Sequence, residues 1–254
     1  MTRSWPALGA LVLAAALVHG HSWAQTPQAP PAPVTPATRP APLPKDVAFG
    51  RFIAQIRGHL LTGDELVRER NWVDAAHHFG FPSEEIYGVI REDLPAYKTP
   101  HFDDALKDLV RMVKARSLKQ YPSALQRVER ALNAADTNLK TRQPNWPRFV
   151  TQVAVAVLKA APDEYDDAVA KDRIVRPIGY QTARGFILQA DRMIESVAVE
   201  LSFDNAAPLA DIRSGLAQLK PGFAPVEAPK QPVLDYAEVA AIVSRVELAA
   251  AKLN

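Results

Sequence analysis

The chain of 254 residues contains no cysteine. It therefore forms no disulfide bond and offers no thiolate as a catalytic nucleophile or a metal ligand. A lipid anchor attached through cysteine is excluded for the same reason. Folding stability has to come from the burial of apolar side chains.

The sequence also lacks the short motifs of common chemistries. It has no glycine-rich phosphate loop, no His-Glu-x-x-His zinc motif and no nucleophile elbow. The formal net charge is only +2, and no run of six residues carries charge of one sign. We therefore predict neither an enzyme activity nor a nucleic-acid partner. A hydrolase with an unrecognised site stays open, with no residue pattern in its favour.

No apolar run is long enough to cross a bilayer. The longest one near the start, Leu8 to Val18, has about eleven residues, whereas a spanning helix needs ~20. It follows Arg3 and precedes the small-x-small sequence Ser22-Trp23-Ala24. We predict a signal peptide over residues 1–24, cleaved after Ala24, and a periplasmic or secreted protein with no remaining transmembrane helix. A retained membrane anchor is the alternative.

Residues 25–45 carry eight prolines and favour an extended, stiff linker that buries no core. They act either as a tether or as a ligand for an aromatic groove of a partner. Residues 46–254 remain, and we predict that they form a single helical-bundle domain.

Apolar residues recur at helical spacing through residues 46–254. Phe49, Phe52, Ile53, Ile56 and Leu60, for example, follow the i, i+3, i+4, i+7 pattern of an amphipathic helix. The fold class is therefore all-α, an up-and-down bundle of nine or ten helices with proline-marked turns. The expected helices cover 46–70, 72–79, 84–97, 102–116, 122–139, 149–161 with a kink or restart at Pro162, 180–201, 208–219 and 236–253. Residues 172–179 are expected to form a connector, and 220–232 an extended loop over the surface.

Four ionisable residues fall on or beside apolar helix faces. His59 lies in the buried stripe of the first helix, Glu164 continues the apolar line of the sixth if that helix runs through Pro162, and Glu247 borders the stripe of the last. Arg184 is the cation available to either acid. We predict an interior polar cluster of His59, Glu164, Arg184 and Glu247, serving either as a structural ion-pair network or as a ligand-binding site.

A second set of residues could bind a metal. His78 lies one helical turn after Asp74, and a short turn separates it from Glu84 and Glu85. Together with His59 these side chains would suit a first-row transition metal in an oxygen and nitrogen shell. Glu84 and Glu85 also fit the ordinary role of acids in the first turn of a helix.

Several short motifs resemble those of a group of exported bacterial all-helical proteins. This group is similar to the imelysin-like and iron-uptake-associated periplasmic proteins. The motifs are Gly58-His59, Gly63-Asp64-Glu65-Leu66, His78-Phe79-x-x-Pro82-x-Glu84-Glu85-Ile86-Tyr87 and Tyr180-Gln181-x-Ala183-Arg184-Gly185-Phe186.

The chain also departs from that pattern, which has a second histidine at the position of Phe81 and acids at Gly179 and Thr182. The imelysin motif Gly-x-His-x-x-Glu is absent as well. The resemblance implies a link to metal uptake and no enzyme activity, and these departures remove some of the metal-capable groups.

These observations favour a periplasmic or secreted helical binding or scaffold protein. The alternative is a metal-binding accessory of an iron or other metal uptake system. Expected partners are a periplasmic protein or a membrane transporter, and the expected cofactor, if there is one, is a transition metal ion.

Overall fold

The computed structural model describes residues 42–254. The predicted signal peptide, and the predicted linker up to residue 41, lie outside the described residues. The first helix begins at Lys45, directly after Pro44, as expected where a proline-rich segment gives way to an amphipathic one.

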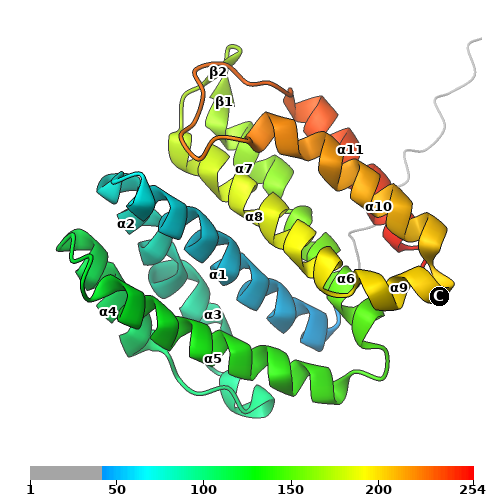
Figure 1. The fold of residues 1–254 in the computed structure, drawn as a ribbon, viewed down its shortest axis with the longest axis horizontal. Coiled ribbons are helices and arrows are strands. Elements are labelled where there is room, and N and C mark those ends of the chain that lie inside the picture. Colours follow the sequence, from blue (N-terminus) through cyan, green and yellow to red (C-terminus); the bar gives the residue numbers. More distant parts are fainter. Residues whose placement is uncertain (1–41) are drawn as a thin grey trace, which may run out of the picture. The chain divides into compact units, whose positions relative to one another are not determined.

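The first part of the described chain forms helices around one long amphipathic element, α1 (Figure 1). The elements in order are α1 (Lys45–Arg68), α2 (Trp72–Phe81), the π-helix η1 (Pro82–Ile86), α3 (Tyr87–Ile90), the 3-10 helix η2 (Leu94–Tyr97), α4 (Asp103–Lys114) and α5 (Tyr121–Arg142).

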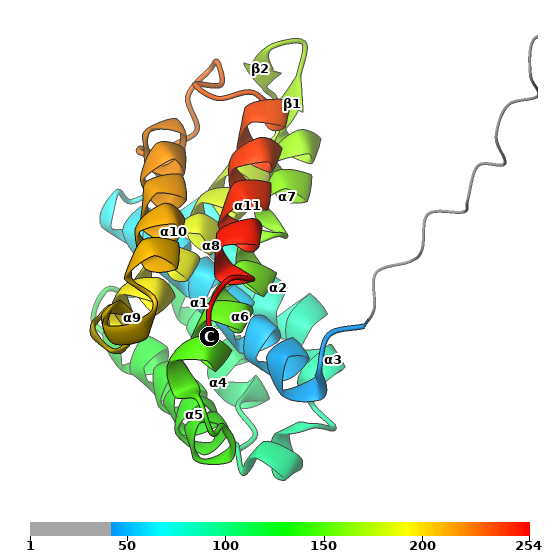
Figure 2. The same cartoon turned by 90° about the vertical axis from the view of Figure 1, so that its right-hand side faces the viewer.

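The second part is also helical, apart from one small hairpin. Its elements are α6 (Trp146–Leu158), α7 (Ala161–Ala168), β1 (Val169–Ala170), β2 (Arg173–Ile174), α8 (Pro177–Ser196), α9 (Ala198–Asp204), α10 (Ala206–Leu219), the 3-10 helix η3 (Lys220–Phe223) and α11 (Tyr236–Ala250). Helices α10 and α11 run side by side along one flank (Figure 2).

The predicted all-α bundle is confirmed. Within residues 42–254 the strand content is limited to β1 and β2, which pair antiparallel with Val169 opposite Ile174. This hairpin falls partly in the stretch expected to be a connector. None of the described helices combines the length and apolar character that a membrane-spanning segment needs.

Helices α1 and α8 pack against each other in the middle of the bundle (Figure 1). They approach closely because a glycine of each helix faces the other at the crossing, Gly58 on α1 and Gly185 on α8. The apolar face of α1 is buried, with Ile53, Ile56 and Leu66 at 1% exposure or less. This pairing positions the functional side chains described below.

Two predicted helices are interrupted. The expected helix 84–97 is broken into η1, α3 and η2, because the backbone widens into a π-turn at Pro82 and tightens into a 3-10 turn at Pro95. The expected helix 180–201 begins earlier, at Pro177, and ends at Ser196 before α9. Pro162 restarts the chain as α7, one of the two outcomes anticipated for it.

The proline-rich loop 220–232 was expected to lie over the surface, and that prediction is wrong for its first half. Phe223 is 2% exposed and stacks on Tyr180 with ring centroids 5.4 Å apart. The Tyr180 hydroxyl donates to the carbonyl of Pro225 at 3.0 Å. The loop enters the core because side chains of α8 satisfy its backbone carbonyls.

Candidate functional site

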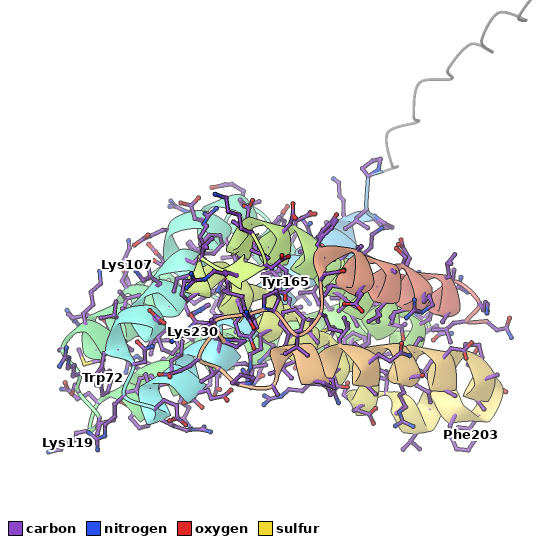
Figure 3. All side chains as sticks on the ribbon, turned by 90° about the horizontal axis from the view of Figure 1, so that it is seen from above. Trp72, Lys107, Lys119, Tyr165, Phe203 and Lys230 are labelled. Carbon is purple, nitrogen blue, oxygen red and sulfur yellow. The ribbon has the colours of Figure 1, made fainter. Side chains whose placement is uncertain are left out.

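A cavity of about 870 Å³ opens between α2–η1 on one side and α7 with the start of α8 on the other. Trp72, which lines it, lies near one end of the molecule, and the exposed Phe203 lies at the opposite end (Figure 3). The lining mixes aromatic and aliphatic side chains with both signs of charge. It comprises His59, Trp72, Val73, Ala76, His77, His78, Gly80, Phe81, Glu84, Glu85, Lys114, Arg116, Glu164, Asp167, Arg176, Pro177, Ile178, Gly179 and Thr182.

A π-helix forms one wall of this cavity. The backbone N–H of Tyr87 donates to the carbonyl of Pro82, five residues earlier, where an α-helix would bond to the fourth. Pro82 has no N–H to continue the hydrogen bonding of α2, which favours the change of register at this point. π-Turns are rare and occur frequently at functional sites. This one places Glu84 and Glu85 on the cavity wall.

His59 and His78 form a buried pair at the base of the cavity. Their exposures are 2% and 1%, and their Nδ1 atoms lie 3.2 Å apart. Burial lowers the pKa of His59 well below its usual value, and the neighbouring His78 lowers it further. Burial also lowers the pKa of His78 to about 4, outweighing the Gln181 contact and the charge of Asp74, which act in the opposite direction. Both rings are therefore neutral near pH 7.

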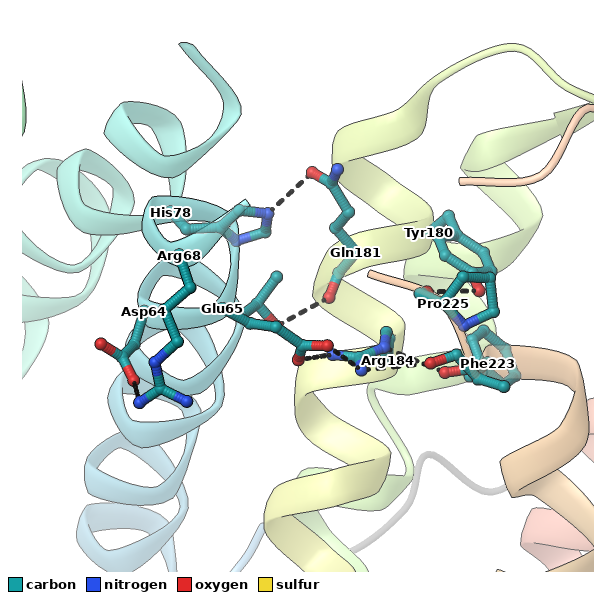
Figure 4. Close-up of polar contacts among 11 residues, drawn as sticks. Asp64, Glu65, Arg68, His78, Tyr180, Gln181, Arg184, Phe223 and Pro225 are labelled. Atoms are coloured by element: carbon teal, nitrogen blue, oxygen red, sulfur yellow. Dashed lines mark hydrogen bonds and ion pairs between the residues drawn. The ribbon is translucent and has the colours of Figure 1, made fainter. Parts of the chain in front are cut away.

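Hydrogen bonds fix which nitrogen of each ring carries the proton. The Gln181 amide nitrogen donates to Asp74 Oδ2 at 2.9 Å, since a carboxylate can only accept. The amide oxygen of Gln181 then faces His78 Nε2 at 3.1 Å and accepts its proton (Figure 4). A neutral His78 has no proton left for Nδ1, so His59 Nδ1 donates to it.

These hydrogen bonds leave His59 Nε2 without a proton, so that its lone pair is free to accept. The atom is buried and has no hydrogen-bond partner among the described residues. The ring of Phe81 stacks on His59 with centroids 4.9 Å apart, and the Phe186 ring meets it edge-on. A buried acceptor without a partner costs free energy, about 1–3 kcal/mol. An imidazole lone pair that lines a cavity is suited to a metal ion or to a donor group of a ligand.

The cavity rim carries slightly more negative than positive charge. Its acids are Glu84, Glu85, Glu164 and Asp167, and its cations are Lys114, Arg116 and Arg176. Burial raises the pKa of Glu164, and the nearby Asp167 and Asp163 raise it further. Glu164 is half-buried and forms no ion pair within residues 42–254. The half-buried acid and the neutral His59 thus lie in the same cavity.

The predicted cluster of His59, Glu164, Arg184 and Glu247 is not assembled. Arg184 Nη1 lies 2.7 Å from Glu65 Oε2, and Arg184 Nε donates to the carbonyl of Phe223 at 3.0 Å (Figure 4).

Glu247 faces solvent, where it pairs with Lys159 at 2.5 Å. Glu247 lies at the edge of the apolar face of α11, and a side chain at that edge can point toward solvent. Of the four predicted residues, only His59 and Glu164 line the same cavity.

The predicted metal set of His59, His78, Glu84 and Glu85 lines the cavity but does not form a ready ligand sphere. Among residues 42–254, no three histidine or acidic side chains converge closely enough to hold a metal ion. The two histidines are hydrogen-bonded to each other, and Glu84 and Glu85 are exposed on the wall. Neutral histidines and carboxylates still fit a first-row metal chemically.

The residues that orient the histidines were not all predicted. Asp74 was expected to meet His78 directly, and instead it acts through Gln181. Asn71 caps α2 and also donates to Asp74 Oδ2 at 3.0 Å. Thr62 donates to the Gln181 carbonyl at 3.2 Å. Gln181 is a polar residue amid an apolar helix face, and this was the one sequence signal that could have identified it.

The fold and the cavity define an all-α bundle that holds a ligand-sized pocket above a buried histidine pair. Residues 140–254 match the family model of the iron permease-associated 4-helix bundle domain. This segment contains α6 to α11 and therefore one wall of the cavity, whereas His59 and His78 precede it. The C-terminal part of the chain is thus similar to an iron permease-associated domain. No curated protein and no solved structure matches the chain.

Proposed function

We propose that the protein is an accessory of an iron-uptake system and works beside an iron permease. The observation that carries this proposal is the match of residues 140–254 to an iron permease-associated domain, because those residues supply α7 and α8 to the cavity. The predicted signal peptide supports a place of action outside the cytoplasm. Iron is then the cargo of the protein and not a resident cofactor.

The cavity supports a direct role in handling the metal. His59 Nε2 offers a neutral imidazole lone pair, a ligand type that suits iron. The acids of the rim add carboxylate oxygens, another ligand type that divalent metals accept. Gln181 and Asp74 hold the ring orientations in the way that outer-shell partners do for metal-bound histidines.

Uptake of radioactive iron by cells grown under iron limitation tests the proposal. Deletion of the gene should lower the rate of uptake, and the wild-type gene should restore it. A variant carrying His59→Gln should restore less uptake than the wild type, whereas His101→Gln, which changes an exposed histidine outside the cavity, should restore it fully. Unchanged iron uptake in the deletion strain, with normal growth on scarce iron, would contradict the proposal.

A second candidate function, that of a partner-binding scaffold, is favoured by the surface of α9. Val199 and Phe203 are one helical turn apart and 70% and 79% exposed, and Phe203 lies at the end of the molecule opposite Trp72 (Figure 3). Large exposed apolar side chains next to each other are characteristic of interaction sites. Co-purification with the permease should be lost on Phe203→Glu and kept on Leu248→Glu, a control at another exposed apolar residue.

A further inference from the structure

The base of the cavity supplies one strong metal ligand from the protein. His59 Nε2 is a desolvated lone pair, held in one tautomer by the hydrogen bonds that run from Asp74 through Gln181 and His78. The Nδ1 and Nε2 atoms lie on different edges of the ring, so Nε2 is the atom left for a ligand. His78 is not available in the same way, because both of its nitrogens are already hydrogen-bonded.

The cavity does not supply the other ligands that a bare ion needs. A first-row metal in a protein takes four or more ligands, and tetrahedral sites are closed by four side chains. Within the described part of the chain, no three histidine or acidic groups converge on one point. A free metal ion bound to His59 would have water molecules in most of its coordination positions.

The space above His59 is much larger than an ion. At about 870 Å³ it falls within the range of pockets that hold small organic molecules, roughly 300–1,000 Å³. Trp72, Phe81 and Ile178 give it apolar walls. Lys114, Arg116 and Arg176 line the same cavity, and guanidinium and ammonium groups are the natural partners of carboxylates.

We propose that this cavity binds iron as a complex with a small carboxylate chelator, and that His59 Nε2 fills a coordination position that the chelator leaves open. The proposal rests on the proposed function in iron uptake and names the form in which the cargo is bound. The chelator supplies the oxygen ligands that the protein lacks. The Lys114, Arg116 and Arg176 side chains contact its free carboxylates.

Binding requires one rearrangement. Phe81 covers the His59 ring, so its side chain has to rotate away from His59 to admit the complex. Phe81 is already 42% exposed and directly precedes the π-helix η1, where the helical hydrogen bonding changes register. The displaced ring can then pack against the chelator as part of the apolar wall.

The test uses the full chain and the nitrilotriacetate complexes of Fe(III) and Cu(II), which keep coordination positions open for an added imidazole. Calorimetry with the Fe(III) complex compares the wild type with His59→Gln and with the matched control His101→Gln, an exposed histidine that does not line the cavity. Binding should weaken at least about tenfold in His59→Gln, the scale seen even for loss of an outer-shell partner. Binding should be unchanged in His101→Gln. The free chelator and free iron should each bind more weakly than the complex.

A spectroscopic readout keeps the test valid if His59→Gln fails to fold. In a chain with His19, His21, His77 and His101 replaced by Gln, only His59 and His78 remain. Electron paramagnetic resonance of the Cu(II) complex on this chain should show coupling to one imidazole. Absence of that coupling would overturn the proposal, as would an equal loss of binding in His59→Gln and His101→Gln, or equal binding of the free chelator.

The two proposals can fail separately. If the complex binds through His59 while iron uptake is normal in the deletion strain, the uptake role is wrong and the site stands. If uptake depends on the gene but no imidazole coordinates the Cu(II) complex, the chelate site is wrong and the uptake role stands.

Discussion

Gly185 lies so close to Gly58 that a Cβ at Gly185 would be 2.5 Å from the carbonyl oxygen of Gly58 and 2.7 Å from Thr62 Oγ1. No side chain fits in that space, so the two glycines set the separation of α1 and α8. The same crossing lets Thr62 reach the Gln181 carbonyl and brings Gln181 to His78. The position of the histidine pair therefore depends on Gly58 and Gly185, two residues without a functional side chain.

Gly185→Ala should destabilise the fold and disturb the histidine pair. The added methyl group meets backbone that cannot move aside cheaply, and overpacking of this kind costs about 1–3 kcal/mol. Urea denaturation measures the loss. Gly88→Ala is the control, because a Cβ at Gly88 meets nothing within 4 Å, and it should be neutral or stabilising by up to about 1 kcal/mol. Equal effects of the two substitutions would contradict the close packing of α1 on α8.

Gln181→Met should cost about 1–3 kcal/mol, because it leaves the buried His78 Nε2–H without an acceptor. It also removes a donor from Asp74. Gln189→Met, on the same helix and similarly buried, should cost less, because the Gln189 side chain forms no hydrogen bond to another residue of the 42–254 segment. The comparison is made by chemical denaturation at pH 7, and a larger loss in Gln189→Met would argue against the hydrogen-bonded chain.

Arg184→Met should loosen the loop that follows α10. Arg184 pairs with Glu65 and donates to the Phe223 carbonyl, so the substitution leaves that buried carbonyl without its donor at a cost of about 1–3 kcal/mol. Amide hydrogen exchange should rise in residues 222–226. Lys159→Met breaks a solvent-exposed pair with Glu247 and should cost at most about 1 kcal/mol, with no change in that exchange. Unaltered exchange in Arg184→Met would show that the loop is held in another way.

The helical architecture could be predicted because it depends on local spacing. The recurrence of Phe49, Ile53, Ile56 and Leu60 identified the buried face of α1, and it placed His59 on that face, where the side chain is 2% exposed. The breaks within the third predicted helix, 84–97, could not be anticipated in the same way. An apolar pattern runs through a π-turn almost unchanged, although the turn shifts which side chains share a face.

The partners of the polar residues could not be read from local spacing. His78 and Gln181 are 103 residues apart, and they meet only because α1, α2 and α8 converge near Gly58 and Gly185. Glu247 was assigned to the interior because it borders an apolar stripe, yet Lys159 of another helix holds it at the surface. Periodicity indicates which face of a helix is buried, and it does not tell which helix lies opposite.

The buried histidines should make stability depend on pH below neutrality. Their pKa values are lowered in the folded state, so the unfolded chain takes up protons first as the pH falls below about 6.5. The contribution of the neutral histidines to the free energy of unfolding is fully present above pH 6.5 and declines between pH 6.5 and 4. The loss attributable to His78 is about 3 kcal/mol, and His59 adds to it. The raised pKa of Glu164 acts in the opposite direction.

Unfolding free energies measured between pH 7.5 and pH 5 check this expectation above the range in which most carboxylates titrate. The decrease of the unfolding free energy with falling pH should persist in His77→Gln, because His77 is exposed. A flat profile from pH 7 to pH 5 would mean that the two histidines are not kept neutral by burial.

The assignment of protons in the histidine pair is tested most directly by nitrogen-15 NMR of the imidazole rings at pH 7. Long-range proton–nitrogen correlations distinguish a protonated ring nitrogen from a bare one. We expect His78 to be protonated at Nε2 and His59 at Nδ1, with His59 Nε2 showing the shift of a free lone pair. A proton on His59 Nε2, or a positive charge on either ring, would contradict the assignment and remove the ligand atom on which the proposed metal-chelate site depends.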